Sequence, residues 1–72
     1  HAMTITLNGQ PTPIVPGTTV RQVIEARKLS PDKVAIELNR RLLRSDRYEC
    51  ELKEGDELEI VTFVGGGGVT ES

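Results

Sequence analysis

The chain has 72 residues and a formal net charge of −2, which suits one domain with one small core and excludes two domains. Its single cysteine cannot close an internal disulfide, and its cysteine and histidine together cannot supply a zinc site. The mixed charge and the two aromatic residues, Tyr48 and Phe63, argue against a nucleic-acid partner.

The N-terminal residues His1 and Ala2 precede Met3 and are interpreted as a remnant of tag removal. The sequence shows no charged and apolar leader and no apolar run long enough to cross a bilayer. We therefore expect a cytoplasmic protein with no membrane partner.

A β-hairpin is predicted at the start of the sequence. Residues 4–8 alternate polar and apolar side chains, which indicates a half-buried strand. Asn8-Gly9 is a typical tight hairpin turn, and the partner strand over 12–15 is expected at a sheet edge because prolines limit its donors.

A single helix is predicted next. Thr19 followed three residues later by Gln22 is a capping-box pattern, and apolar residues then recur at helical spacing. The helix is expected over 19–28, ending before Ser30-Pro31, with an inward face made of Val20, Val23 and Ile24.

The second half of the sequence predicts more strands. Alternation indicates one strand over 33–39 and a last strand over 57–64, with inward residues Val34, Ile36, Leu38, Leu58 and Ile60. Between them we expect a short strand from residues 42–43, a capped helical turn over 45–48 and a turn over 53–56.

The predicted fold class is α+β. One helix can cover only one face of a mixed sheet of four to five strands, and the proline-free first and last strands are expected at its centre. This layout is that of the ubiquitin-like β-grasp fold, and the alternative is a two-layer sandwich with another strand order. The domain is expected over 3–64, followed by a flexible glycine-rich tail over 65–72.

No catalytic constellation is apparent in the sequence. Beyond His1 no histidine can act as a general base, and Cys50 is interpreted as a partly buried filler rather than a nucleophile. The four arginines between residues 40 and 47 are interpreted as a solvated face. The glycine run over 65–68 lacks the lysine, hydroxyl residue and helix of a phosphate-binding loop. We therefore do not expect an enzyme.

The glycine run has two interpretations. Its composition alone favours a disordered tail or linker. Alternatively, residues without a Cβ form a narrow thread, spanning about 17 Å from Val64 to Gly68, that carries a terminal carboxylate into a partner's active site. The apolar Phe63 and Val64 directly before the run favour this second interpretation.

From Met3 to Gly67 the sequence resembles the ThiS family, the sulfur carrier proteins of thiamine (thiazole) biosynthesis. The resemblance rests on the Asn8-Gly9 hairpin, on VPGTTVRQVIE and LNRRLLRSDRYE, and above all on LKEGDELEIV followed by TFVGGG. It implies a carrier whose C-terminal glycine carboxylate is adenylated and converted to a thiocarboxylate. Gly67 is the first choice for that glycine, with Gly66 and Gly68 as alternatives.

The resemblance also implies the partners. An adenylyltransferase resembling ubiquitin-activating enzymes would spend ATP on the glycine carboxylate, and a sulfur donor such as a cysteine desulfurase would supply the sulfur. Thiazole synthase would receive that sulfur. The carrier itself is expected to bind no cofactor and to be monomeric on its own.

Two further expectations concern the end of the chain. Strand alternation turns Val61 and Phe63 away from the helix, beside Thr4, Thr6 and Ala35. An apolar patch leading to the tail suits an interface made of Val61, Phe63, Val64 and Gly65. The alternative is that Phe63 folds back onto the domain's own edge.

Residues 69–72 make the required carboxylate an internal peptide bond, so this segment either is clipped from a precursor or derives from cloning.

Other functions stay open at this point. A molybdopterin-type sulfur carrier would use the same chemistry, but such carriers resemble a Pro-Pro approach to the glycines, which is absent here. A ubiquitin-like modifier joined to lysines, or an interaction module with a flexible tail, would belong to other classes.

Overall fold

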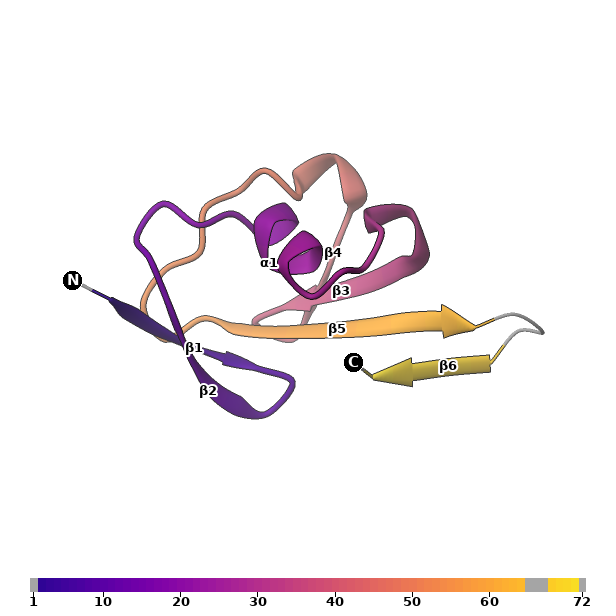
Figure 1. The fold of residues 1–72 in the computed structure, drawn as a ribbon, viewed down its shortest axis with the longest axis horizontal. Coiled ribbons are helices and arrows are strands. Elements are labelled where there is room, and N and C mark those ends of the chain that lie inside the picture. Colours follow the sequence, from indigo (N-terminus) through magenta and orange to yellow (C-terminus); the bar gives the residue numbers. More distant parts are fainter. Residues whose placement is uncertain (1, 65–67, 72) are drawn as a thin grey trace.

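The computed structural model describes residues 2–64 and 68–71, and in this part of the chain one α-helix lies across one face of a mixed sheet (Figure 1). The strand order is β2-β1-β5-β3-β4, and β6 also pairs with β5. The helix is α1 (Val20–Ala26), and the strands are β1 (Met3–Leu7), β2 (Gln10–Ile14), β3 (Val34–Leu38), β4 (Arg41–Leu43), β5 (Glu57–Val64) and β6 (Gly68–Glu71). The predicted α+β class is confirmed.

The first hairpin places β1 inside the sheet, as predicted. β1 pairs antiparallel with β2 and parallel with β5, so β1 and β5 each have neighbours on both sides. The turn consists of Asn8 and Gly9, which both adopt positive φ, 48° and 81°. Because this two-residue turn lets pairing resume at once, β2 begins at Gln10, two residues before the predicted strand.

The helix begins at the predicted capping box. The Thr19 hydroxyl accepts a hydrogen bond from the Gln22 backbone N–H at 3.1 Å, and the Gln22 side chain accepts one from the Thr19 N–H at 2.9 Å. The helix ends at Ala26, two residues earlier than predicted, because Lys28 adopts a left-handed φ of 62° and takes the chain out of the helix before the proline.

The core lies between α1 and the inner face of the sheet. Its buried residues are Ile5, Leu7, Val20, Val23, Ile24, Val34, Ile36, Tyr48, Leu52, Leu58 and Ile60. Every inward residue expected from the strand and helix patterns is in this set except Leu38, which is half-buried against it. Burial of these side chains is the main favourable contribution to folding.

The segment between β4 and β5 closes the core beside the helix. Backbone carbonyls of Tyr48 and Cys50 accept hydrogen bonds from the first helical N–H groups, those of Arg21 and Val20, at 2.8 and 3.1 Å. Cys50 packs partly buried against the core, as expected of a filler. The helical turn is present over Ser45–Arg47, but the expected side-chain cap is wrong, since no cap hydrogen bond forms there.

The end of the chain carries an unpredicted strand. Gly68–Glu71 forms β6, which runs antiparallel beside the last residues of β5, below it in Figure 1. The sequence instead predicts a flexible tail over 65–72, because chain ends with glycines and small polar residues are commonly mobile. The remainder of that tail, residues 65–67 and 72, lies outside the described residues.

Candidate functional site

The candidate site is built on β5, the strand that leads directly into the glycine run. Leu58 and Ile60 are 2% and 0% exposed and anchor β5 in the core. Because side chains alternate along a strand, Glu57, Glu59, Val61 and Phe63 point to the face opposite the helix. The core therefore sets the orientation of the outer face.

Asn8 holds one edge of β5. Its backbone N–H donates to the Leu58 carbonyl at 2.9 Å, its side-chain oxygen accepts from the Ile60 N–H at 2.7 Å, and its side-chain nitrogen donates to the Ile60 carbonyl at 3.2 Å. These bonds extend the short parallel ladder, in which β1 pairs with β5 only at Glu57 and Leu58. The Asn8 side chain thus makes the hydrogen bonds to β5 that a further residue of β1 would otherwise make.

Asn39 holds the other edge of β5 from the β3–β4 turn. Its N–H donates to the Glu57 carbonyl at 2.7 Å, and its side-chain oxygen accepts from the Glu57 N–H at 2.9 Å. Its side-chain nitrogen also donates to Asp56 at 3.1 Å. Two turn asparagines therefore fix the first half of β5, a role that the sequence analysis missed because the local pattern reveals only the turn at Asn8.

The second half of β5 extends beyond the residues that are hydrogen-bonded to Asn8 and Asn39. Pairing with β3 reaches only Val34 opposite Thr62, so Phe63 and Val64 lie past the end of that ladder. Phe63 is 53% exposed and Val61 is half-buried opposite Ala35. Phe63 therefore points outward, and the alternative in which it folds back onto the domain does not describe this structure.

One part of the predicted docking surface is wrong. Thr6 lies opposite Glu57, four residues before Val61, because β1 runs parallel to β5 and turns away after Leu7. Thr4 lies further toward the start of β1, and its carbonyl accepts from Gly55. Neither threonine is beside Phe63.

The remaining predicted site residues are placed only in part. The backbone of Val64 pairs with that of Gly68 at the start of β6. Gly65, Gly66 and Gly67 lie outside the described residues. Their assignment to partner contact and to adenylation stays a prediction.

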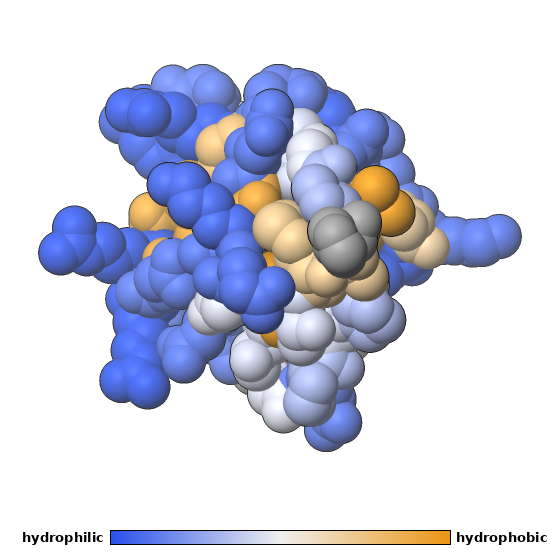
Figure 2. All heavy atoms as spheres, turned by 90° about the vertical axis from the view of Figure 1, so that its left-hand side faces the viewer, coloured by the Kyte–Doolittle hydropathy of each residue, from blue (hydrophilic) through white to orange (hydrophobic). Residues whose placement is uncertain are grey.

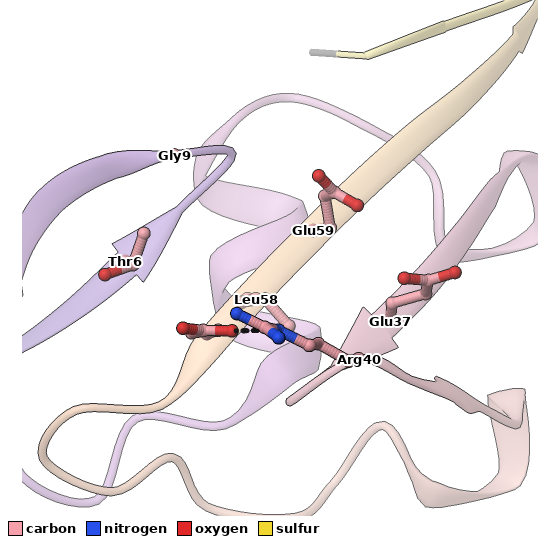
Figure 3. Close-up of a pocket in the computed structure, with 7 residues that line it drawn as sticks. Thr6, Gly9, Glu37, Arg40, Leu58 and Glu59 are labelled. Atoms are coloured by element: carbon pink, nitrogen blue, oxygen red, sulfur yellow. Dashed lines mark hydrogen bonds and ion pairs between the residues drawn. The ribbon is translucent and has the colours of Figure 1, made fainter.

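The outer face also has a hollow of about 350 Å³, lined by Thr6, Gly9, Glu37, Arg40, Glu57, Leu58 and Glu59. Arg40 reaches across it to Glu57, with Nε 3.2 Å from the carboxylate, while Glu37 and Glu59 lie side by side on paired strands (Figure 3). The face therefore changes along β5 from acidic side chains to the apolar Val61 and Phe63.

The surface at one end of the molecule is different. Seen from the end that carries the N-terminus, it is mostly hydrophilic and its apolar residues form small areas (Figure 2). Among residues 2–64 and 68–71 the structure has no group of acidic, cysteine or histidine side chains that could hold a metal ion. No helix in the same residues has the length and apolarity needed to cross a membrane.

Comparison with known proteins identifies the family of this chain. The family model described as the ThiS family matches residues 5–67, from β1 through β5 and into the glycine run. The chain belongs to the ThiS family. A crystal structure of the thiamine biosynthesis protein ThiS from Geobacter metallireducens superimposes with a TM-score of 0.70 at 33% identity, covering 90% of this chain and 100% of that one. The β-grasp fold is therefore confirmed.

Two relatives extend this comparison. The sulfur carrier protein ThiS of Bacillus subtilis (strain 168) is 38% identical over 50 residues, 68% of this chain and 76% of that protein. The thiazole synthase of Magnetococcus marinus is 38% identical over 66 residues, which cover 90% of this chain. That synthase is much longer, and the chain spans only 20% of its length.

Proposed function

We propose that this ThiS-family chain is a sulfur carrier for thiazole formation in thiamine biosynthesis. The observation that carries the proposal is the glycine run directly after β5, at the end of the region that the family model matches. The Bacillus subtilis relative, which is named a sulfur carrier protein, supports the same function. The chain would act as a cosubstrate, with catalysis supplied by partner enzymes.

The chemistry requires a glycine with a free carboxylate. A carboxylate is a poor acyl donor because it has no good leaving group, so a partner adenylyltransferase would first join it to AMP from ATP and release pyrophosphate. The terminal sulfur of a persulfide, derived from cysteine, would then displace AMP to form an acyl disulfide. Attack of a thiol on its S–S bond would release the thiocarboxylate and leave a disulfide. The carrier needs no bound cofactor for any of these steps, because ATP binds to the partner.

Gly67 is our proposed terminal glycine, with Gly66 and Gly68 as alternatives. In the present sequence Gly67 is followed by Gly68 and then by residues 69–72, so hydrolysis of a peptide bond must precede adenylation. Glycines suit this role because a backbone without side chains fits a narrow channel. Phe63 and Val61 would contact the partner surface outside that channel.

Thiazole synthase is the proposed recipient of the sulfur. The Magnetococcus marinus relative named thiazole synthase contains a region similar to 90% of this chain, which supports a direct functional connection between carrier and synthase. The same relative favours thiazole formation over molybdopterin synthesis or protein modification. A cysteine desulfurase is proposed as the source of the sulfur.

The experiment is a mass measurement after reaction with a purified ThiS-activating adenylyltransferase, ATP and sulfide. A version ending at Gly67 is expected to gain about 16 Da, because one carboxylate oxygen is replaced by sulfur, whereas the chain ending at Ser72 is not. Equal conversion of both versions would exclude the need for clipping. Absence of conversion in versions ending at Gly66, Gly67 and Gly68 would exclude the carrier function.

A further inference from the structure

The edge of β5 from Val61 to Val64 carries a strand from the same chain. β1 leaves this edge after Leu7, and the Asn8 side chain covers it only as far as Ile60. Beyond Ile60 the edge is paired with β6 in antiparallel register, with partners Val61↔Glu71, Thr62↔Thr70, Phe63↔Val69 and Val64↔Gly68. Among the described residues β6 pairs with β5 and with no other strand.

The alternation of backbone groups identifies which residues hold β6. Ile60 presents both its N–H and its carbonyl to the Asn8 edge, so Thr62 and Val64 present theirs to the same edge. Thr62 and Thr70 therefore form a hydrogen-bonded pair of the antiparallel ladder. The backbones of Phe63 and Val69 form a pair without hydrogen bonds between them.

We propose that this edge is a docking surface for an extended segment of a partner protein, and that residues 68–71 are its exchangeable occupant. An open strand edge binds an added strand through main-chain hydrogen bonds, and the side chains opposite it set the preference. The register of β6 defines that preference as a β-branched residue opposite Phe63 and a second one opposite Thr62.

The construction of β6 makes exchange easy. It has four residues and one neighbouring strand, so few hydrogen bonds hold it. Its connection to β5 is made of glycines, which lose more backbone entropy on ordering than any other residue. A partner segment that is already extended would avoid that entropy cost.

Exchange would also release the glycine run, a consequence that rests on the proposed function. β6 runs antiparallel to β5, with Gly68 opposite Val64, so residues 68–71 lead back along β5 toward Val61. In the chain that still carries residues 68–71, a glycine thread that extends into a partner's channel requires β6 to leave β5. The partner strand would then bind the edge at the moment when the thread becomes available.

Two proline substitutions in the full chain test the occupancy. Thr70→Pro removes an N–H that points toward β5, whereas Val69→Pro removes one that points away, as edge strands tolerate. Amide hydrogen exchange at Thr62 and Val64 is expected to be about tenfold faster in Thr70→Pro and unchanged in Val69→Pro. The amide of Ile36, in the middle of β3, reports whether each variant is folded. Equal exchange at Thr62 and Val64 in all three chains would overturn the proposal.

A peptide then tests docking from outside. Acetyl-Gly-Val-Thr-Glu-Ser-amide, added at millimolar concentration to the Thr70→Pro chain, is expected to slow exchange at Thr62 and Val64 again, while a peptide with proline in place of threonine is not. Exchange that stays fast with both peptides would overturn the docking surface. Neither readout involves ATP or sulfur, so a failure here is distinguishable from a failure of the carrier function.

Discussion

Asn8 and Asn39 each combine a turn with a hydrogen-bond pair to β5. Both have positive φ, 48° and 53°, a conformation in which asparagine is among the most tolerated residues other than glycine. Both also present a side-chain amide oxygen to a backbone N–H of β5, at Ile60 and Glu57. These two residues therefore align the strand that ends in the glycines.

Substitution of Asn8 separates these two contributions. Asn8→Ala is expected to lower the free energy of unfolding by about 2–3 kcal/mol, because it loses the bonds to Ile60 and strains the turn. Asn8→Gly keeps the turn and loses only the bonds, so its loss should be smaller, about 1–2 kcal/mol. Urea unfolding measures both values. An Asn8→Gly chain as stable as the unmodified one would show that the side-chain bonds contribute nothing.

Tyr48 gives the protein an alkaline sensitivity. Burial raises the pKa of the Tyr48 phenol above its ordinary value of about 10. Below about pH 10 the phenol is protonated in folded and unfolded chains alike, so its stabilising contribution is complete. Above that pH the unfolded chain releases the proton first, which favours unfolding, and stability is lost as the pH rises through the folded pKa.

The corresponding test compares urea unfolding at several alkaline pH values. The unmodified chain should lose more stability above about pH 10 than Tyr48→Phe, which has no phenol to ionise. Because Tyr48 is the one tyrosine of the sequence, its phenolate absorbance reports the titration directly. Parallel stability profiles for the two chains would contradict the prediction.

At the scale of elements, α1 depends on its first turn more than on its length. It has seven residues, which is too short to be stable alone, so it relies on packing and on its cap. The reciprocal bonds between Thr19 and Gln22, together with carbonyls from the segment before β5, satisfy its first N–H groups.

Removing the cap should therefore be measurable. Thr19→Ala is expected to lower the free energy of unfolding by about 1 kcal/mol, the usual loss for a capping threonine. Ser45→Ala is the matched control, since Ser45 begins a short helical turn in which no side-chain cap bond forms. Equal losses in the two variants, measured by chemical denaturation, would contradict a specific role for the cap.

Most elements could be predicted because their signals are local. The Asn8-Gly9 turn, the Thr19 capping box and the alternation of β5 each depend on a few neighbouring residues, and all three are present in the structure. The early end of α1 at Ala26 was not predictable, because the left-handed φ of Lys28 that follows it is a conformation that lysine does not favour. The strand β6 was missed since its pairing comes from an open edge that only the assembled sheet creates.

At the scale of the whole molecule, we propose the outer face of the sheet as the surface that partners bind. Phe63→Ala should weaken binding to the adenylating partner by about 1–3 kcal/mol, as expected for an exposed aromatic anchor, and leave thermal unfolding unchanged. Val15→Ala removes another exposed apolar side chain, in the loop after β2, and serves as the control. Calorimetric titration measures both affinities. A Phe63→Ala chain that binds as tightly as the Val15→Ala chain would remove Phe63 from the interface.

The candidate site was only partly predictable at this scale. Strand alternation correctly turned Phe63 and Val61 outward, because that property follows from the period of two residues. Their neighbours were not predictable, since the parallel register of β1 places Thr6 beside Glu57 and depends on contacts distant in sequence. The acidic hollow next to them arises in the same way, from residues on three strands and on the turns that follow β1 and β3.

The parallel pairing of β1 with β5 has a mechanical consequence. A partner that pulls on the glycines pulls along the axis of β5, while the hydrogen bonds to Asn8, Asn39 and β3 lie across that axis. Under such a load these bonds are sheared together instead of opening one after another. The fold thus resists traction at the end of β5 much better than peeling from the side, so the proposed glycine thread could be held or withdrawn without unfolding the domain.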